Sequence, residues 1–421
     1  MYHKTTLDNG LRILSSYMPH THSVCIAMFI GVGSRYESDK EAGISHFIEH
    51  VSFRGTAKRP EARDISEAIE GVGGILNGAT DKELTFYWCK VTKDHFAMAT
   101  EVLSDMLLNS NFKAEDIEKE RQVIIEEINM GKDSPQQQVS QLIDSLLWPD
   151  HPLGRDIAGT KDSIAAIDRN ALLKFLKDRY TPKNTLVTVA GNVKDEEVIK
   201  VVSSLMGSWH NPKTQKKYLS YKDSTDQRLL IENRDTEQAH ICLAFPGVSI
   251  VDDSRFCLDL LNVILGEGMS SRLFSEIRDK MGLAYSISSY VDHYLDSGSL
   301  TVSASVDPKN LNKAVKAILD QLGYLKDGIP ESELNKARQI CKGRMLLRME
   351  DSRNVAGWLG GQEILLNKIL SLEEIIEKIN AVTIEQLTDI ARKYIVPEQM
   401  RLAVVGPVKS DKTLRKLLKI K

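Results

Sequence analysis

Residues 165–193 read AAIDRNALLKFLKDRYTPKNTLVTVAGNV, and residues 380–408 read NAVTIEQLTDIARKYIVPEQMRLAVVGPV. Each segment has an amphipathic stretch, then a proline, then an apolar run that ends in glycine. Pro182 aligns with Pro397, 215 residues later, and the rest of the two segments follows at the same offset. A repeated pattern at a fixed offset predicts two copies of one structural unit.

Two further pairs of segments support the duplication. Residues 85–107 resemble residues 300–322 at the offset of 215, and Arg121-Gln122 resembles Arg338-Gln339 at 217. A generic amphipathic pattern rarely gives several matches in one order at nearly one offset. The chain of 421 residues is therefore expected to form two similar domains with a polar connection between them. The expected ranges are a first domain at 1–210, a linker at 211–225 and a second domain at 226–421.

The local patterns predict the fold class of each copy. Asp8-Asn9-Gly10 is a hairpin turn signal, and apolar runs predict strands at 11–18, 23–32, 85–91 and 186–191. Amphipathic periodicity predicts helices at 42–53, 62–72, 94–108, 114–130, 135–148 and 169–180. Strands that alternate with long helices and hairpin signals predict an α+β fold, with a mainly antiparallel sheet packed with helices in each domain.

Composition excludes several classes of protein. An apolar fraction of 42% and a charged fraction of 27% are typical of globular proteins, not of disordered, collagen-like or coiled-coil chains. The formal charge of −3 gives no electrostatic reason to expect a nucleic-acid partner. The sequence contains no run of about 18 apolar residues, so it predicts no membrane span. Five scattered cysteines without a C-x-x-C pair, and an N-terminus without an apolar signal-peptide core, predict a cytoplasmic protein.

The stretch GISHFIEHVSF, residues 43–53, holds the one pair of histidines that lie four residues apart. On a helix His46 and His50 share a face one turn apart, so both imidazoles can reach one ion, with Glu49 on their flank. The opposite side carries an apolar stripe with Phe47 at its edge, formed by Ile44, Ile48 and Val51. Core histidines satisfied by backbone groups would sit in that stripe, and a solvated polar face is the other alternative.

A catalytic zinc site with two histidines needs a third protein ligand and keeps one position open. The helix at 114–130 offers glutamates, of which Glu126 points to solvent while Glu120 and Glu127 border its apolar side. Glu127 is therefore the expected third ligand, and Glu120 is expected to orient a histidine. The expected buried side of this helix consists of Ile117, Val123, Ile124, Ile125 and Ile128.

His46-x-x-Glu49-His50 is the inverted form of a zinc-protease motif. With it, the chain resembles the insulinase/pitrilysin family of zinc metallopeptidases, and its length resembles the mitochondrial processing peptidase-like branch. The family's third ligand follows at a matching distance, because 76 residues separate His50 from Glu127. The family also has a glutamate seven residues earlier, and Glu120 stands at that position.

The resemblance implies further site residues that the sequence pattern alone does not identify. The family's Gly-Gly-x-x-Asn-Ala stretch, on an edge strand that pairs with substrate, resembles residues 73–78, where Gly78 replaces the usual alanine after Asn77. Arg278 and Tyr285 match an arginine and a tyrosine that help to bind substrate and stabilise the transition state. One Zn²⁺ per chain and Glu49 as general base on a zinc-bound water are implied, with short or unfolded peptides as substrates.

The second copy lacks the metal-site residues. At the offset of 215, His46, Glu49 and His50 correspond to Leu261, Ile264 and Leu265, and at 217 Glu127 corresponds to Arg344. The family likewise carries metal only in its N-terminal domain. These residues are therefore not needed by the domain fold itself.

The length of the chain resembles half of the longer single-chain family members. This implies a homodimer in which Arg278 and Tyr285 complete the zinc site of the partner chain. The alternative is a non-catalytic or partner-dependent subunit of a processing-peptidase-like complex.

Overall fold

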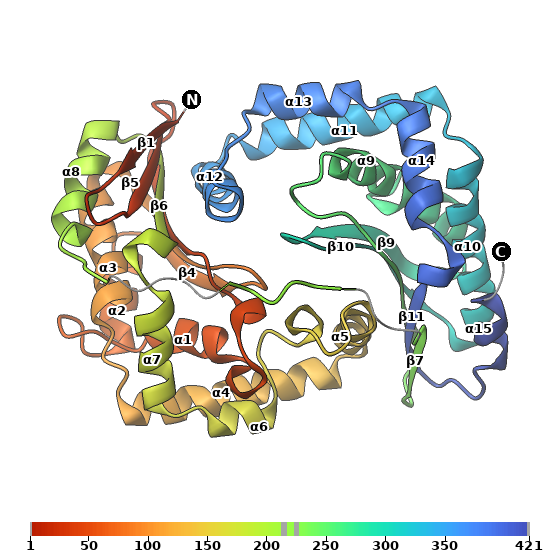
Figure 1. Cartoon of the computed structure of the whole chain (residues 1–421), viewed down its shortest axis with the longest axis horizontal. Helices are drawn as coiled ribbons and strands as arrows, with labels where there is room; N and C mark the ends of the chain where they lie inside the picture. The colour runs from red at the N-terminus through yellow and green to blue at the C-terminus, as the bar shows by residue number, and fades with distance from the viewer. Residues whose placement is uncertain (1, 212–216, 223–226, 419–421) are drawn as a thin grey trace. The chain divides into compact units, whose positions relative to one another are not determined.

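The computed structural model describes residues 2–211, 217–222 and 227–418, which form two compact units, each built around one sheet (Figure 1). The first unit comprises the residues up to Asn129 together with Asp156–Leu219 and Leu346–Leu370. The second comprises Met130–Arg155, Ser220–Met345 and the residues from Ser371 onward. Most of the predicted linker lies outside the described residues, and the domain ranges 1–210 and 226–421 stay a prediction.

The two sheets share one strand order, apart from the additional edge strand β1 of the first sheet. The first sheet contains, in spatial order, β1 (His3–Thr6), β2 (Arg12–Tyr17), β6 (Thr185–Gly191), β3 (Ser23–Ile30), β5 (Thr85–Thr92) and β4 (Ile75–Thr80). The second contains β7 (Leu229–Asn233), β11 (Arg401–Gly406), β8 (Ala239–Pro246), β10 (Gly298–Val306) and β9 (Ala284–His293). Only β2 with β6 and β7 with β11 pair in parallel among these strands. The predicted duplicated α+β fold with mainly antiparallel sheets is confirmed.

The helices follow the amphipathic pattern closely. In the first half they are α1 (Ile44–Ser52), α2 (Ala62–Glu70), α3 (Phe96–Asn109), α4 (Ala114–Asp133), α5 (Pro135–Leu147), α6 (Lys161–Ala166), α7 (Arg169–Arg179) and α8 (Asp195–Met206). In the second half they are α9 (Arg255–Gly266), α10 (Leu311–Asp327), α11 (Glu331–Arg348), α12 (Ser352–Leu366), α13 (Leu372–Ala381), α14 (Ile384–Tyr394) and α15 (Lys412–Leu417). The six predicted helices correspond to α1–α5 and α7, and their ends agree within three residues.

The central strand β3 is buried on both faces. Ile26 and Met28 belong to the main core of the first unit, which also contains the apolar side of α1. Cys25 and Phe29 point to the other face and pack in a second cluster with α12. A strand covered on both faces reads as a continuous apolar run, which explains the stretch SVCIAMFI. Gly360 of α12 lies so close to Phe29 that a Cβ there would clash with the aromatic ring.

Each half of the sequence contributes one helix to the compact unit that is formed mainly by the other half. Helix α5, from the first half of the sequence, packs on β8 and β11 of the second unit through residues such as Val139 and Ile143. Helix α12, from the second half, packs on β3 and β6 of the first unit. The sequence pattern predicts an apolar face for both helices, but it does not say which sheet that face covers.

Helix α4 differs from the prediction at Val123. Ile117, Ile124 and Ile128 are buried, and Ile125 packs against the core while partly exposed. Val123 is 40% exposed, so its assignment to the buried side was wrong. The buried stripe is centred on Ile124, and at about 100° per residue Val123 lies a quarter turn or more from that centre.

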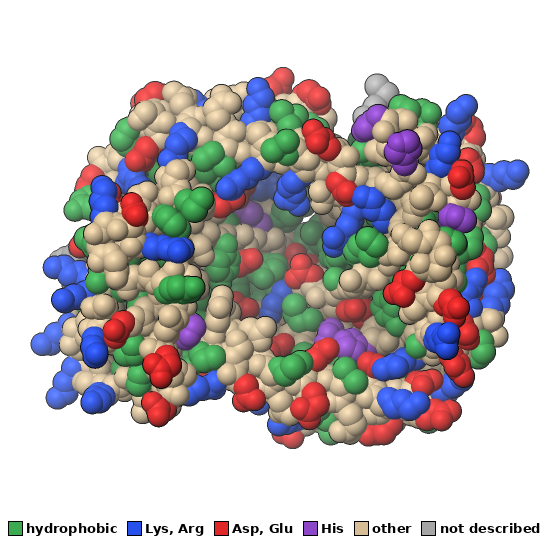
Figure 2. Space-filling view, turned by 180° about the vertical axis from the view of Figure 1, so that it is seen from behind, with side chains coloured by type: hydrophobic (Ala, Val, Ile, Leu, Met, Phe, Trp, Pro, Cys, Tyr) green, Lys and Arg blue, Asp and Glu red, His purple; other side chains and the backbone are tan. Residues whose placement is uncertain are grey.

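The surface agrees with the near-even charge of the sequence. Figure 2 shows acidic and basic side chains intermixed over the face that it presents. In the described parts of the chain, no helix combines the length and the apolar character that crossing a bilayer requires.

Candidate metal centre

Helix α1 presents the two histidines of the motif side by side. Their ring centroids are 4.5 Å apart, and the two Nε2 atoms are 3.2 Å apart. Ile44, Ile48 and Val51 on the opposite side are buried in the core, as the helical wheel predicts. Burial of that stripe fixes the rotation of the helix, so His46 and His50 face the same partly exposed space.

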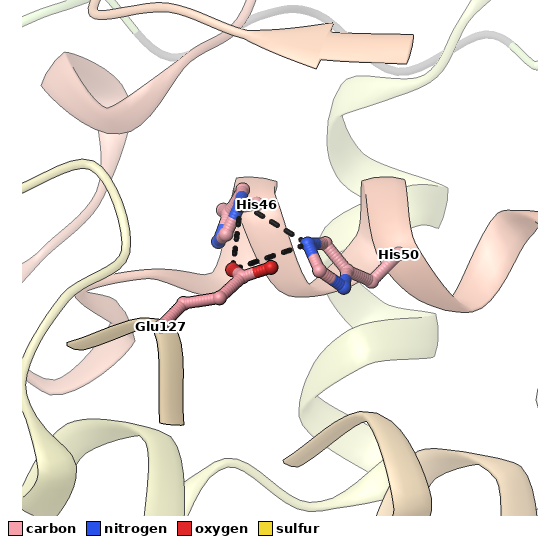
Figure 3. Close-up of side chains that lie close together, drawn as sticks. All are labelled: His46, His50 and Glu127. Carbon is pink, nitrogen blue, oxygen red and sulfur yellow. Dashed lines mark hydrogen bonds and ion pairs between the residues drawn. The ribbon is translucent and has the colours of Figure 1, made fainter. Parts of the chain in front are cut away.

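Glu127 of α4 reaches the same point from a second helix (Figure 3). Its Oε2 lies 3.8 Å from Nε2 of His46 and 3.6 Å from Nε2 of His50. Among the described residues, these three side chains form the one group of at least three histidines, cysteines or carboxylates that could hold a metal ion. Ligand atoms of a tetrahedral zinc site are about 3.3 Å apart when each bond is about 2.0–2.1 Å. The spacing of the three atoms, 3.2–3.8 Å, therefore fits a zinc ion.

A carboxylate fixes the ring of His50. Glu120, which is buried, lies with its Oε2 2.8 Å from Nδ1 of His50. The Arg54 guanidinium pairs with the other oxygen of Glu120 and so orients the carboxylate. With the Nδ1 proton donated to Glu120, the Nε2 lone pair of His50 is free for an ion. Glu120 thus lies where the sequence placed an orienting residue.

Among the described residues, the ring of His46 has no carboxylate partner of this kind at Nδ1. Its Nδ1 atom is buried and has no hydrogen-bond partner in the described structure. Burial, together with the neighbouring His50, lowers the pKa of His46 to about 4. The imidazole is therefore neutral near pH 7, which is the form that binds metals.

Glu49 is a residue of helix α1, and its side chain reaches the edge strand β4. Its Oε2 accepts a hydrogen bond of 2.9 Å from the hydroxyl of Thr80. A Cβ on Gly78 would come within 2.9 Å of Oε1, so the glycine leaves that oxygen clear. Burial raises the pKa of Glu49 above its ordinary value, while the Thr80 hydrogen bond opposes that rise. Such a carboxylate is suited to take and return a proton.

Asn77 and Gly78 lie on the predicted edge strand. Strand β4 is the last strand of its sheet, and in the described residues it pairs with β5 alone. Gly78 and Thr80 share the face toward Glu49, whereas Asn77 points away and is exposed. The Oδ1 atom of Asn77 accepts a hydrogen bond of 2.8 Å from the Gly78 backbone N–H.

Arg278 and Tyr285 lie together in the second compact unit. The guanidinium carbon of Arg278 is 5.9 Å from the centre of the Tyr285 ring and 4.7 Å from that of Phe274. Tyr285 is 74% exposed at the start of β9, and Arg278 is also exposed. The structure thus brings the two residues next to each other, on a different unit from His46, His50 and Glu127.

The second copy uses the equivalent positions for packing. Leu261, Ile264 and Leu265 are buried in helix α9, and Arg344 pairs with Glu267. The helix that corresponds to α1 is thus apolar where α1 is polar. The second copy thus forms the equivalent helix without the polar cluster of α1.

Three neighbours of the cluster were not predicted from the sequence. They are Thr80 beside Glu49, Arg54 beside Glu120, and Glu37, whose carboxylate binds the start of α1. Thr80 stands two residues after Gly78 on the same strand, so strand alternation was a usable signal for it. Arg54 and Glu37 act through contacts that no periodicity in the sequence indicates.

Comparison with known proteins agrees with this geometry. Residues 12–161 match the profile of the insulinase family, peptidase family M16, and residues 166–341 match that of the peptidase M16 inactive domain. The chain is 37% identical to the uncharacterized zinc protease YmxG of Bacillus subtilis over 97% of this chain and 98% of that protein. The chain belongs to the insulinase family. An uncharacterized zinc protease of Mycobacterium leprae is 36% identical over 99% of this chain and 94% of its own length.

Solved structures share the whole fold of this chain. A protease from Helicobacter pylori superposes with a TM-score of 0.91 at 25% identity, covering 97% of this chain and 99% of the other. A peptidase M16 inactive domain from Pseudomonas fluorescens reaches a TM-score of 0.89 at 19% identity, over 97% of this chain and 99% of its own. The match to an inactive-domain profile in residues 166–341 agrees with the absence of the motif residues from the second copy.

Proposed function

We propose that this insulinase-family chain is a zinc-dependent endopeptidase that cleaves short or unfolded peptides. The observation that carries the proposal is the convergence of His46, His50 and Glu127 at distances that suit one zinc ion. The curated relatives bear the name zinc protease, which supports the same chemistry. The processing-peptidase-like branch and a cytoplasmic location stay predictions.

His46, His50 and Glu127 would hold the zinc ion. When bound, zinc supplies Lewis acidity toward a peptide carbonyl and lowers the pKa of water toward neutrality. Glu120 and Arg54 would keep the Nε2 atom of His50 directed at the ion.

Glu49 would act as the general base and then as the general acid. Its Oε2 is held by Thr80, so Oε1, on the side left clear by Gly78, is the atom that would take a proton from the attacking water. The same oxygen would then return the proton to the leaving amine nitrogen. Burial raises the pKa of this carboxyl, which favours reversible proton transfer near neutral pH.

Strand β4 would bind the peptide by adding it as a further strand. In the described residues its outer edge is not paired with another strand, and Gly78, which follows Asn77 on this strand, lies against Glu49. Recognition through backbone hydrogen bonds tolerates many side chains, so we expect broad sequence preference. Extended segments are needed for this pairing, which favours short or unfolded substrates.

A metal-removal experiment tests the proposed function. Purified protein is expected to contain about one zinc per chain and to cut internal bonds in a diverse peptide mixture. Mass spectrometry identifies the cleavage products. A chelator should abolish cleavage, and added zinc should restore it, because zinc is required for the chemistry. Cleavage that persists in fully metal-free protein would contradict the proposal.

Arg278 and Tyr285 would bind the substrate and stabilise the developing oxyanion, and in a homodimer they would serve the partner's zinc site. Two inactive variants, Glu49→Gln and the double variant Arg278→Ala/Tyr285→Phe, test this arrangement. If the residues act in trans, an equimolar mixture of re-equilibrated subunits regains about a quarter of wild-type activity, since half of the dimers carry one intact site. No recovery from a mixture that sedimentation proves to be dimeric would place the residues in cis.

A further inference from the structure

Glu37 makes two hydrogen bonds to the first turn of the metal-site helix. Its Oε2 accepts from the backbone N–H of Gly43 at 2.8 Å, and its Oε1 accepts from that of Ser45 at 2.9 Å. The residue is 4% exposed, so both bonds are shielded from water. Hydrogen bonds from backbone N–H groups to a buried carboxylate are among the strong ones.

The start of α1 depends on this carboxylate because it has no cap of its own. Gly43 occupies the position where a serine, threonine or aspartate side chain normally accepts an N–H bond, and it has no side chain to do so. Its φ of +92° suits glycine, and a Cβ there would come within 2.5 Å of the Ala158 carbonyl oxygen. The helix therefore begins at a fixed place, with Glu37 supplying the negative charge that its N-terminus favours.

His46 follows Ser45 directly and lacks the support that His50 receives. Glu120 fixes the ring of His50 through Nδ1, whereas the Nδ1 atom of His46 has no partner in the described structure. The place of the His46 ring is therefore set mainly by the backbone of the first turn and by its packing. That backbone is what Glu37 holds.

We propose that Glu37 is a positioning residue of the metal site, acting through the N-terminus of α1 on His46. It does for His46 through the backbone what Glu120 does for His50 by direct contact. The inference rests on the proposed zinc site. It adds to that site a residue that lies nine positions before His46 in the sequence.

Zinc affinity of the whole chain, measured by competition with a chelating dye, tests this role. Glu37→Gln keeps the volume but turns an N–H₂ group toward a backbone N–H, so we expect the Kd for Zn²⁺ to rise about 10–100-fold, as for other residues that orient metal ligands. The visible spectrum of bound Co²⁺, which reports ligand geometry, is expected to change as well.

Asp351→Asn is the matched control. Asp351 is also a carboxylate that accepts two backbone N–H bonds at a helix start, from Arg353 and Asn354 of α12, in the same compact unit. Helix α12 carries no residue of the metal site, so this variant should bind zinc within about twofold of wild type even where its unfolding midpoint falls. The comparison separates loss of a helix cap from loss of a metal-site support.

The outcomes are distinct. Glu37→Gln with wild-type zinc affinity and an unchanged Co²⁺ spectrum would overturn the role of Glu37 and leave the proposed function intact. A wild-type protein that binds no zinc would overturn the proposed function and this inference together. If Glu37→Gln does not fold, Glu37→Asp is measured in the same way. That variant keeps the charge but is too short for both bonds, and wild-type affinity in it would equally overturn the inference.

Discussion

Replacement of Glu49 by glutamine is expected to lower kcat for peptide cleavage by about 10²–10⁴-fold, the usual contribution of a general acid–base residue. Glutamine has nearly the same shape and can still accept the Thr80 hydrogen bond at its amide oxygen. It cannot take a proton from the attacking water at pH 7. The zinc content should stay at the wild-type level, because Glu49 is not one of the three converging ligands.

A graded variant distinguishes loss of the proton acceptor from loss of its orientation. Thr80→Val removes only the hydroxyl that holds Oε2 of Glu49, and we expect about a tenfold fall in kcat, corresponding to a hydrogen bond of about 1.4 kcal/mol. Cleavage rates and bound zinc are measured together for both variants. Equal cleavage by wild type and zinc-loaded Glu49→Gln would remove the general-base role.

The sequence predicted which side chains of the first copy converge because two helical wheels carry the information. On α1 the apolar stripe fixes the direction of His46 and His50, and on α4 it turns Glu127 toward them while Glu126 is exposed. The same wheel failed at Val123, because residues at the margin of a stripe can fall on either side. The roles of these residues as ligands stay predictions.

Other features of the site could not be predicted from periodicity. A helix face that is apolar must be buried, but its pattern does not name its partner, so the packing of α5 on β8 and α12 on β3 was not foreseen. Glu37 binds backbone groups of α1, and a backbone acceptor leaves no mark in the side-chain pattern. Only the fold places that carboxylate under the first turn of the helix.

Replacement of Glu127 by glutamine is expected to raise the Kd for Zn²⁺ by more than about 100-fold, beyond the 10–100-fold typical of residues that only orient ligands. The carboxylate supplies the negative charge of the ligand set, since both histidines bind as neutral rings. An amide oxygen is a weak zinc ligand, so two imidazoles would be left to hold the ion. Zinc affinity by dye competition and cleavage at increasing free zinc measure the effect.

Glu126→Gln is the control for that variant, because it removes the same charge from the neighbouring position of the same helix. Glu126 is exposed, with Asn129 as its hydrogen-bond partner at 3.4 Å, so its loss should leave zinc affinity within about twofold of wild type. If activity in Glu127→Gln returns at high free zinc, the lost function is metal retention, whereas a rate that stays low at full occupancy indicates disturbed ligand geometry. Wild-type affinity in Glu127→Gln would show that another carboxylate completes the site. Glu49 would then be the next residue to test, because its carboxylate interacts electrostatically with His50 and with Glu127.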